Sequence, residues 1–310
     1  MAHLVESMFS VRTTPWHGLG QVVEHAPNSE EALKIAGLDW AVTQEEVVVN
    51  GLVVPNFKAN VRNDNGKVLG IVSDRYSIVQ NHEAFNFTDN LIGSGDVRYE
   101  TAGSLKDGRV VWMLASLEKE YKILGDEIAP YLCFTNSHDG TGAVRVLMTP
   151  IRVVCNNTLN IAVNGAKRQW STVHKGDIGR KIEDAEKTLM RAEDYMEKLD
   201  ESANKMVDIK ITPATWSDLV NELIPTNTQM SPRQLVTVGE KRQALHNAIM
   251  MEDIKKFQGT GWAVINAVTD FVAHTEPARL TSNYAENNFH KVIQGHTLVD
   301  RAVELLKEIA

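Results

Sequence analysis

The spacing of apolar residues changes near residue 176, and this change constrains the fold more than any other feature of the chain. Before it, short apolar runs alternate with glycine-containing turn signals, a pattern typical of antiparallel strands. After it, apolar residues recur every three or four positions, as in a long helix. The sequence therefore predicts an α+β protein. We expect an antiparallel β-rich domain over residues 1–176 and a helical domain over residues 177–310.

Three dipeptides predict β-hairpins in the first domain. Asn65-Gly66 lies between 57–62 and 67–72, Asp107-Gly108 joins 97–105 to 109–117, and Asp139-Gly140 lies between 131–137 and 142–148. An Asn or Asp followed by Gly readily supplies the positive φ angles that tight turns need. Two short helices are expected among these strands, at 29–36 with Asn28 or Ser29 as N-cap, and at about 81–92.

The second domain is expected to be helical throughout. Apolar residues with a 3.5-residue period predict a long helix over about 177–207; they are Ile178, Ile182, Ala185, Leu189, Ala192, Met196, Leu199, Ala203 and Met206. This apolar seam can pack on its own domain or form a contact between subunits, and we hypothesise a homo-oligomer. Further helices are predicted at 213–223, 232–257, 260–274 and 287–309, separated by Pro-, Gly- and Asn-rich joints.

Composition indicates a folded protein without a membrane span. Of the 310 residues, 43% are apolar and 23% are charged, values typical of globular chains, and no run of 18 or more apolar residues occurs. Cys133 and Cys155 lie in apolar contexts, and the N-terminal residues MAHLVESMFS lack the basic flank and apolar core of a signal peptide. We therefore expect a protein of the reducing cytoplasm.

A strongly basic region occurs in this acidic chain, whose net charge is −8. Residues 140–181 contain one acid, Asp177, and seven basic residues: Arg145, Arg152, Lys167, Arg168, Lys175, Arg180 and Lys181. A local excess of positive charge is typical of surfaces that hold a phosphate backbone, although such charges can also cover a solvated face. Single-stranded nucleic acid is therefore the predicted partner.

Nucleic-acid binding also needs flat groups on which bases can stack. Trp170 directly follows the basic residues, and Tyr76 is a second candidate. The predicted nucleic-acid-binding residues are Arg145, Arg152, Lys167, Arg168, Trp170, His174, Lys175, Arg180 and Lys181. Two alternatives stay open: Trp170 can belong to the core, and Arg152, in an apolar run, can be a buried partner of a carboxylate.

A metal-dependent phosphodiesterase is a rival interpretation. His17, His138, Asp139 and His174 are all predicted in loops, and an imidazole with a carboxylate can share a divalent ion that activates water. The chain has no HxH, HExxH or paired CxxC spacing and no glycine-rich phosphate loop. We therefore predict no catalytic residue, no metal and no cofactor.

Several strings of the sequence together resemble a known family. They are TPWHGLG at 14–20, EALKIAGLDW at 31–40, SDRYSIVQN at 73–81, TAGSLKDGRVVWM at 101–113, GDEIAPYL at 125–132, TNSHDG at 135–140, TPIRVVCNNTL at 149–159 and GWAVINAVTDFVAH at 261–274. The chain resembles the phage- and plasmid-borne family called domain of unknown function 932. The resemblance implies a phage or mobile-element protein of a bacterial host, and it gives no catalytic residue.

The expected architecture is also similar to that of phage single-strand annealing proteins, in which an antiparallel sheet and a long helix hold DNA in a basic groove. The sequence thus predicts a phage or mobile-element single-stranded nucleic-acid-binding protein, with DNA annealing or recombination as its role. One alternative is a counter-defence protein that binds a host protein. The other is the phosphodiesterase.

Overall fold

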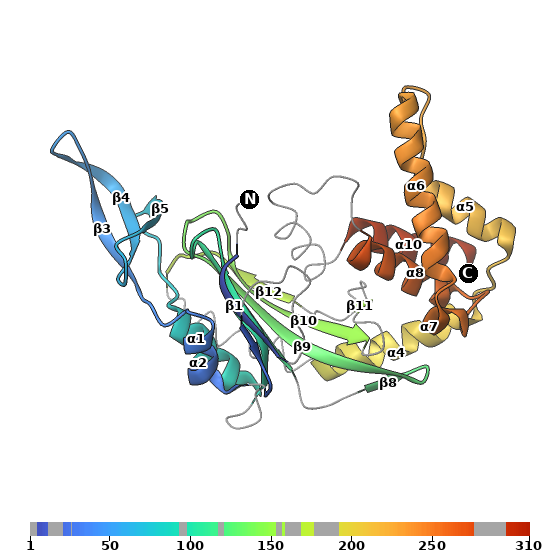
Figure 1. Cartoon of the computed structure of the whole chain (residues 1–310), viewed down its shortest axis with the longest axis horizontal. Coiled ribbons are helices and arrows are strands. Elements are labelled where there is room, and N and C mark those ends of the chain that lie inside the picture. Colours follow the sequence, from blue (N-terminus) through green and yellow to red (C-terminus); the bar gives the residue numbers. More distant parts are fainter. Residues whose placement is uncertain are drawn as a thin grey trace. The chain divides into compact units, whose positions relative to one another are not determined.

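The computed structural model describes residues 5–11, 21–25, 27–92, 98–116, 121–152, 157–158, 169–176, 192–275 and 296–310. Within these residues the chain is α+β, with antiparallel sheets in its N-terminal part and helices in its C-terminal part (Figure 1), as the sequence predicts. It divides into two compact units. Met1–Lys119, Pro130–Met148 and Lys167–Ala192 form the first unit, and Glu120–Ala129, Thr149–Ala166 and Glu193–Ala310 form the second.

The larger sheet has the strand order β11-β10-β9-β7-β6-β1-β2, with β12 paired to β10 and β8 paired to β9. Its strands are β1 (Val5–Val11), β2 (Gln21–Val23), β6 (Arg98–Leu105), β7 (Val110–Ser116), β8 (Tyr121–Ile123), β9 (Asp126–Ser137), β10 (Val144–Arg152), β11 (Asn157–Thr158) and β12 (Gln169–Thr172). Among the described strands, β1 and β2 form a parallel pair, and the other pairs of known direction are antiparallel.

A second sheet contains β3 (Val42–Val49), β4 (Leu52–Arg62) and β5 (Val68–Ser73) in that order. The predicted hairpins β4–β5 and β6–β7 are confirmed by their antiparallel registers, and β9 and β10 are neighbours on either side of Asp139-Gly140. At the β4–β5 turn only Gly66 has a positive φ, because a five-residue connection replaces the predicted two-residue turn.

Two helices pack in the first unit beside the larger sheet: α1 (Ser29–Ile35) and α2 (Asn81–Ile92) (Figure 1). Asn28 is the N-cap of α1, because its side chain accepts from the Glu31 amide while the Glu31 carboxylate accepts from the Asn28 amide. Both helices were predicted. Phe9, Phe85 and Phe134 are fully buried in the core between these helices and the strands.

The helices of the second unit are α4 (Ala192–Asp208), α5 (Pro213–Leu223), α6 (Pro232–Ile249), α7 (Glu252–Lys255), α8 (Gly261–His274) and α10 (Thr297–Ile309). Helix α8 is the centre of this group, since residues 261–270 are all buried and α6, α7 and α10 contact it. No helix in the described part of the chain is long and apolar enough to cross a membrane.

Two helix predictions differ from the structure. The predicted helix 232–257 is divided into α6 and α7 because Met251 has an extended backbone, with ψ 144°, and begins a new helix. The predicted helix 177–207 is confirmed from Ala192 onward, and its earlier residues lie outside the described part. Residues 287–295 of the last predicted helix also lie outside it.

The apolar seam of α4 is buried inside the chain. Met196, Leu199, Ala203 and Met206 are each at most 7% exposed. Of the two interpretations of this seam, the structure therefore supports packing within the chain for these four residues. A subunit contact through them would require the chain to open.

Candidate nucleic-acid interface

Strands β10 and β12 bring two parts of the basic region side by side. They pair antiparallel, with Arg145 opposite Ser171 and Val146 opposite Trp170. Opposite residues of such a pair share a face of the sheet, and successive residues alternate between faces. Val146 is fully buried, so Arg145 and Ser171 lie on the other face. The Arg145 side chain is half-buried and has no ion-pair partner among the described residues.

Trp170 lies on the buried side of β12. Its half-buried side chain packs against the hydrophobic core of the first unit, next to Val146 in the register. Of the two roles that the sequence left open for Trp170, the structure favours the core role. A ring that contacts the core on one side has less surface free for a base.

The segment after β12 is held by His174. Its imidazole is buried and stacks on Tyr76, with ring centroids 4.4 Å apart and planes at 14°. Nδ1 lies 2.9 Å from the Ser77 carbonyl oxygen, and because a carbonyl only accepts, Nδ1 donates. The Ser77 amide in turn donates to the His174 carbonyl oxygen at 3.1 Å. These bonds fasten the segment to residues 76–77.

His174 itself is neutral in this environment. Burial lowers the pKa of His174 below its ordinary value, because the charged imidazolium would lose its hydration. The charged form of His174 is therefore disfavoured in the chain alone. Lys175, the next residue, is exposed and forms an isolated β-bridge with Tyr76 through its backbone. His174 holds the backbone next to Lys175, and Tyr76 is stacked on it in the same cluster. The predicted contact of His174 with nucleic acid stays a prediction.

The His138-Asp139 pair has structural partners. His138 is fully buried, Nε2 lies 3.0 Å from the Asn81 Oδ1, and the Trp40 ring meets it edge-on. Burial lowers the pKa of His138 to about 3. The Asp139 carboxylate accepts from the Ser137 hydroxyl at 2.5 Å and from the amide and hydroxyl of Thr141, which forms the turn before β10.

A glycine lets β5 approach this turn closely. A Cβ placed on Gly70 would lie 2.6 Å from the Asp139 Cα, so a larger residue cannot occupy the position without movement. Nowhere in the described part of the chain do three His, Cys, Asp or Glu side chains gather as a metal site would require. The geometry of His138 and Asp139 is thus that of a packed core residue and a turn.

The other predicted nucleic-acid-binding residues lie partly or wholly outside the described part of the chain. Arg152 pairs with Asn157 at the end of β10 and belongs to the second unit, but its side chain lies outside the described part. Lys167, Arg168, Arg180 and Lys181 lie outside it entirely, as does His17. The structure therefore brings together Arg145, Trp170, His174 and Lys175 within the first unit.

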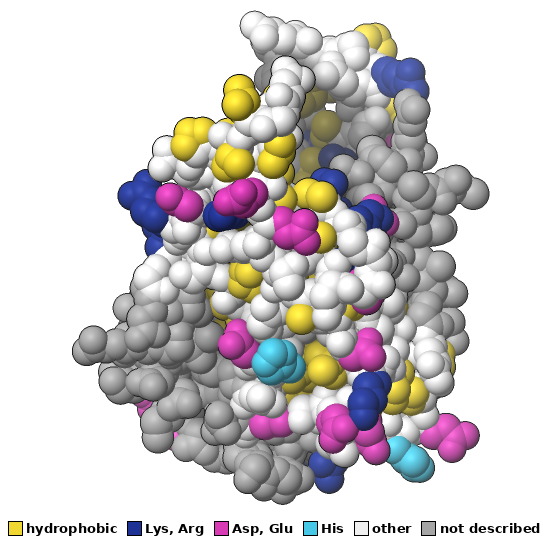
Figure 2. Space-filling model, turned by 90° about the vertical axis from the view of Figure 1, so that its left-hand side faces the viewer, with side chains coloured by type: hydrophobic (Ala, Val, Ile, Leu, Met, Phe, Trp, Pro, Cys, Tyr) yellow, Lys and Arg dark blue, Asp and Glu magenta, His cyan; other side chains and the backbone are white. Residues whose placement is uncertain are grey.

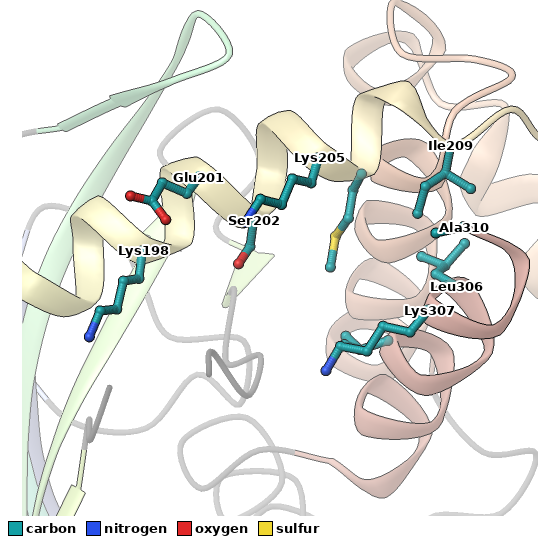
Figure 3. A pocket seen from close by; sticks show the side chains of 10 residues that line it. Lys198, Glu201, Ser202, Lys205, Ile209, Leu306, Lys307 and Ala310 are labelled. Carbon is teal, nitrogen blue, oxygen red and sulfur yellow. The ribbon is translucent and has the colours of Figure 1, made fainter. Parts of the chain in front are cut away.

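Sequence reasoning missed a pocket of about 270 Å³ in the second unit (Figure 3). Apolar side chains of Met206, Ile209, Val303 and Leu306 line it together with Lys198, Lys205 and Lys307. Lys205 and Lys307 lie in the last turns of α4 and α10, where a cation compensates the helix dipole. The spacing of Lys198, Ser202 and Lys205, which places them on one helix face, is the sequence pattern that could have indicated this pocket.

Comparison with known proteins gives one match. The family model described as "Domain of unknown function (DUF932)" matches residues 68–293, well over half of the chain. The chain belongs to this family. No curated protein and no solved structure matches it. The part that matches DUF932 includes β10, β12 and all nine predicted nucleic-acid-binding residues, whereas β3 and β4 precede it.

Proposed function

We propose that this DUF932 protein binds single-stranded nucleic acid along the surface that β10 and β12 form. The observation that carries the proposal is the antiparallel pairing of these strands, which sets Arg145 beside Ser171 on the face opposite to Val146 and Trp170. An arginine without an ion-pair partner in the described chain and a neighbouring hydroxyl are groups that commonly contact phosphate oxygens. Lys175 extends the positive charge beyond the end of β12.

The proposed mode of binding is electrostatic. Because Trp170 packs on the core, phosphate contacts supply most of the affinity and base identity has little effect. Lys167 and Arg168 directly precede β12 in the sequence, and Arg180 and Lys181 follow Lys175. The segments before and after β12 are therefore both rich in basic residues. Binding of this kind suits a DNA annealing or recombination factor of a phage or mobile element, acting as a homo-oligomer in a bacterial cytoplasm.

The test is the affinity for fluorescent single-stranded oligonucleotides, measured by anisotropy over a range of salt concentrations. Arg145→Ala should weaken binding to every sequence and reduce the salt slope by about 0.7, the value for one lost phosphate contact on a single strand. Arg233→Ala is the matched control, because it removes the same charge from an exposed position of α6 in the second unit. It should leave both quantities unchanged.

A double variant, Lys167→Ala with Arg168→Ala, extends the test to the residues before β12. It should reduce the salt slope by about 1.4, twice the effect of one contact. If the wild-type chain binds no oligonucleotide at low salt, where attraction is strongest, the proposal fails. The counter-defence alternative, binding of a host protein, then takes its place.

A further inference from the structure

Basic side chains are concentrated at the pocket between α4 and α10 in the second unit. Helix α4 contains six acidic residues and two lysines, and α10 contains three acidic and two basic residues. Three of these four basic residues, Lys198, Lys205 and Lys307, line the pocket, whereas of the nine acids Glu201 alone does so. On the face of the molecule shown in Figure 2, by contrast, basic side chains lie next to acidic ones. The pocket is therefore a local positive site on two acidic helices.

The floor of the pocket is apolar and closely packed. Met206, Val303 and Leu306 line it and are each at most 7% exposed. Gly261, the first residue of α8, packs against the same floor, because a Cβ placed on it would lie 3.0 Å from the Met206 carbonyl oxygen and 3.2 Å from the Leu306 Cδ2. Its amide donates to the Ile209 carbonyl oxygen at 3.0 Å. Close packing of this kind holds the floor in place.

The helix dipole explains only part of the positive charge. Lys205 and Lys307 lie in the last turns of their helices, where a cation offsets the partial negative charge of the helix end. Lys198 lies more than two turns before the end of α4, and the dipole effect falls off within the last turn. Neither Lys205 nor Lys307 forms an ion pair with another described residue. Their charges are therefore available to a ligand.

The ligand that matches this site has an anionic head group and a short apolar chain. A free inorganic anion would leave the apolar floor uncovered, and an uncharged apolar molecule would leave the lysines without a partner. The carboxylate of Glu201 points away from Leu306 and Lys307 in Figure 3, so it does not take the place of the head group. The volume of about 270 Å³ lies near the lower end of the range of roughly 300–1,000 Å³ for ligand pockets, which favours a small ligand.

We propose that the pocket between α4 and α10 binds a small amphipathic carboxylate. Its head group lies between Lys205 and Lys307, and its apolar chain lies on Met206 and Leu306. Ser202 also lines the pocket, and its hydroxyl can donate a hydrogen bond to the head group. All lining residues belong to the second unit, whereas Arg145 belongs to the first. The proposal therefore does not depend on nucleic-acid binding.

Calorimetric titration with octanoate tests this site in the full chain without oligonucleotide. Octanoate should bind at a single site. Hexanoate should bind about tenfold more weakly, because two fewer CH₂ groups are removed from water. Octylammonium, which has the same chain and the opposite charge, should bind far more weakly because the lysines repel it. Equal affinities of hexanoate and octanoate, or of octanoate and octylammonium, would overturn the proposal.

Lysine substitutions test where the head group lies. Lys205→Ala combined with Lys307→Ala should weaken octanoate binding by about tenfold, because two exposed ion pairs are lost. The same double variant should bind octanol as the wild type does, since octanol carries no charge. Lys241→Ala is the matched control, because it removes a lysine from an exposed position of α6 in the same unit. It should leave octanoate binding unchanged.

Circular dichroism and urea unfolding show whether the double variant keeps its fold, as expected for two exposed positions. Absence of saturable octanoate binding to the wild type, at concentrations below those at which octanoate forms micelles, would overturn the proposal. Unchanged affinity in the folded double variant would also overturn it. Neither result affects the oligonucleotide affinity of Arg145→Ala, so failure of this proposal is distinguishable from failure of the proposed function.

Discussion

At the scale of residues, two histidines that look reactive in the sequence have a structural role in the fold. His138 and His174 both resemble candidates for chemistry, since each lies in a polar string beside charged residues. In the fold both are buried and hydrogen-bonded, and burial lowers the pKa of each. They link residues 76–81 to the turn before β10 and to the segment after β12. Their role in the proposed interface is to position it.

The neutral state of these histidines predicts how stability depends on pH. In the unfolded chain a histidine takes up a proton near pH 6.5, whereas folded His138 does so only near pH 3. Between these values the unfolded state binds more protons, so the free energy of unfolding falls as the pH falls. The contribution of His138 is about 1.4 kcal/mol for each pH unit below about 6.5.

Urea unfolding at pH 7, 6 and 5 measures this dependence. His138→Gln should lower stability at pH 7 and make the decline toward pH 5 shallower, because one titrating group is gone. His82→Gln, at an exposed position of α2, should leave the decline as in the wild type. An unchanged slope in His138→Gln would contradict the assignment of His138 as buried and neutral.

At the scale of elements, the apolar repeat of α4 allows two kinds of helix packing. The 3.5-residue spacing is equally compatible with a coiled coil between subunits and with a helix packed inside one chain. The burial of Met196, Leu199, Ala203 and Met206 gives the second solution for the described half of the seam. Exposed apolar side chains occur at other places, among them the β3–β4 hairpin, where Val48, Val49, Leu52 and Val53 are 53–74% exposed.

This placement predicts the effect of a charge on the seam. Met196 is 1% exposed, so Met196→Glu would bury a carboxylate without a partner and lower the free energy of unfolding by about 3 kcal/mol or more. Asn204→Glu introduces the same charge at an exposed position of α4 and should change stability little. Thermal unfolding and light scattering distinguish the outcomes. A folded Met196→Glu chain with lower mass than the wild type would restore the seam as a subunit contact.

For the whole molecule, charge is unevenly distributed. The chain has a net charge of −8, yet residues 140–181 are strongly basic, so attraction for a polyanion is local and depends on ionic strength. Pairing of β10 with β12 gathers part of this region on one surface of the first unit. The acidic remainder opposes non-specific association with nucleic acid elsewhere on the protein.

A whole-molecule prediction concerns metal. Because no metal-binding cluster occurs among the described residues and Asp139 is engaged in its turn, chelation with EDTA should change neither the melting temperature nor the oligonucleotide affinity. Metal analysis of the purified chain provides the check. Stoichiometric zinc or manganese that is lost in His138→Ala would contradict this expectation and favour the phosphodiesterase interpretation.

Much of the secondary structure is determined locally and could be predicted. Asn28 and Glu31 form the cap that begins α1, Thr212 and Pro213 begin α5, and Asp107-Gly108 forms the β6–β7 turn. The Asn50-Gly51 turn carries the same signal, although we did not predict it. The division of α6 from α7 could not be predicted, since Met250 and Met251 carry no helix-stop signal.

Sequence by itself determined the α+β class, the family and the basic region, because caps, turns, apolar periods and local charge are properties of neighbouring residues. Tertiary structure alone decided that His138 and His174 are buried and that Trp170 faces the core. It also decided that Arg145 lies beside Ser171 and that the apolar side chains at the tip of the β3–β4 hairpin are exposed. These outcomes depend on contacts between residues distant in the chain. The free energy of burying a side chain is set by such contacts, and local pattern does not encode them.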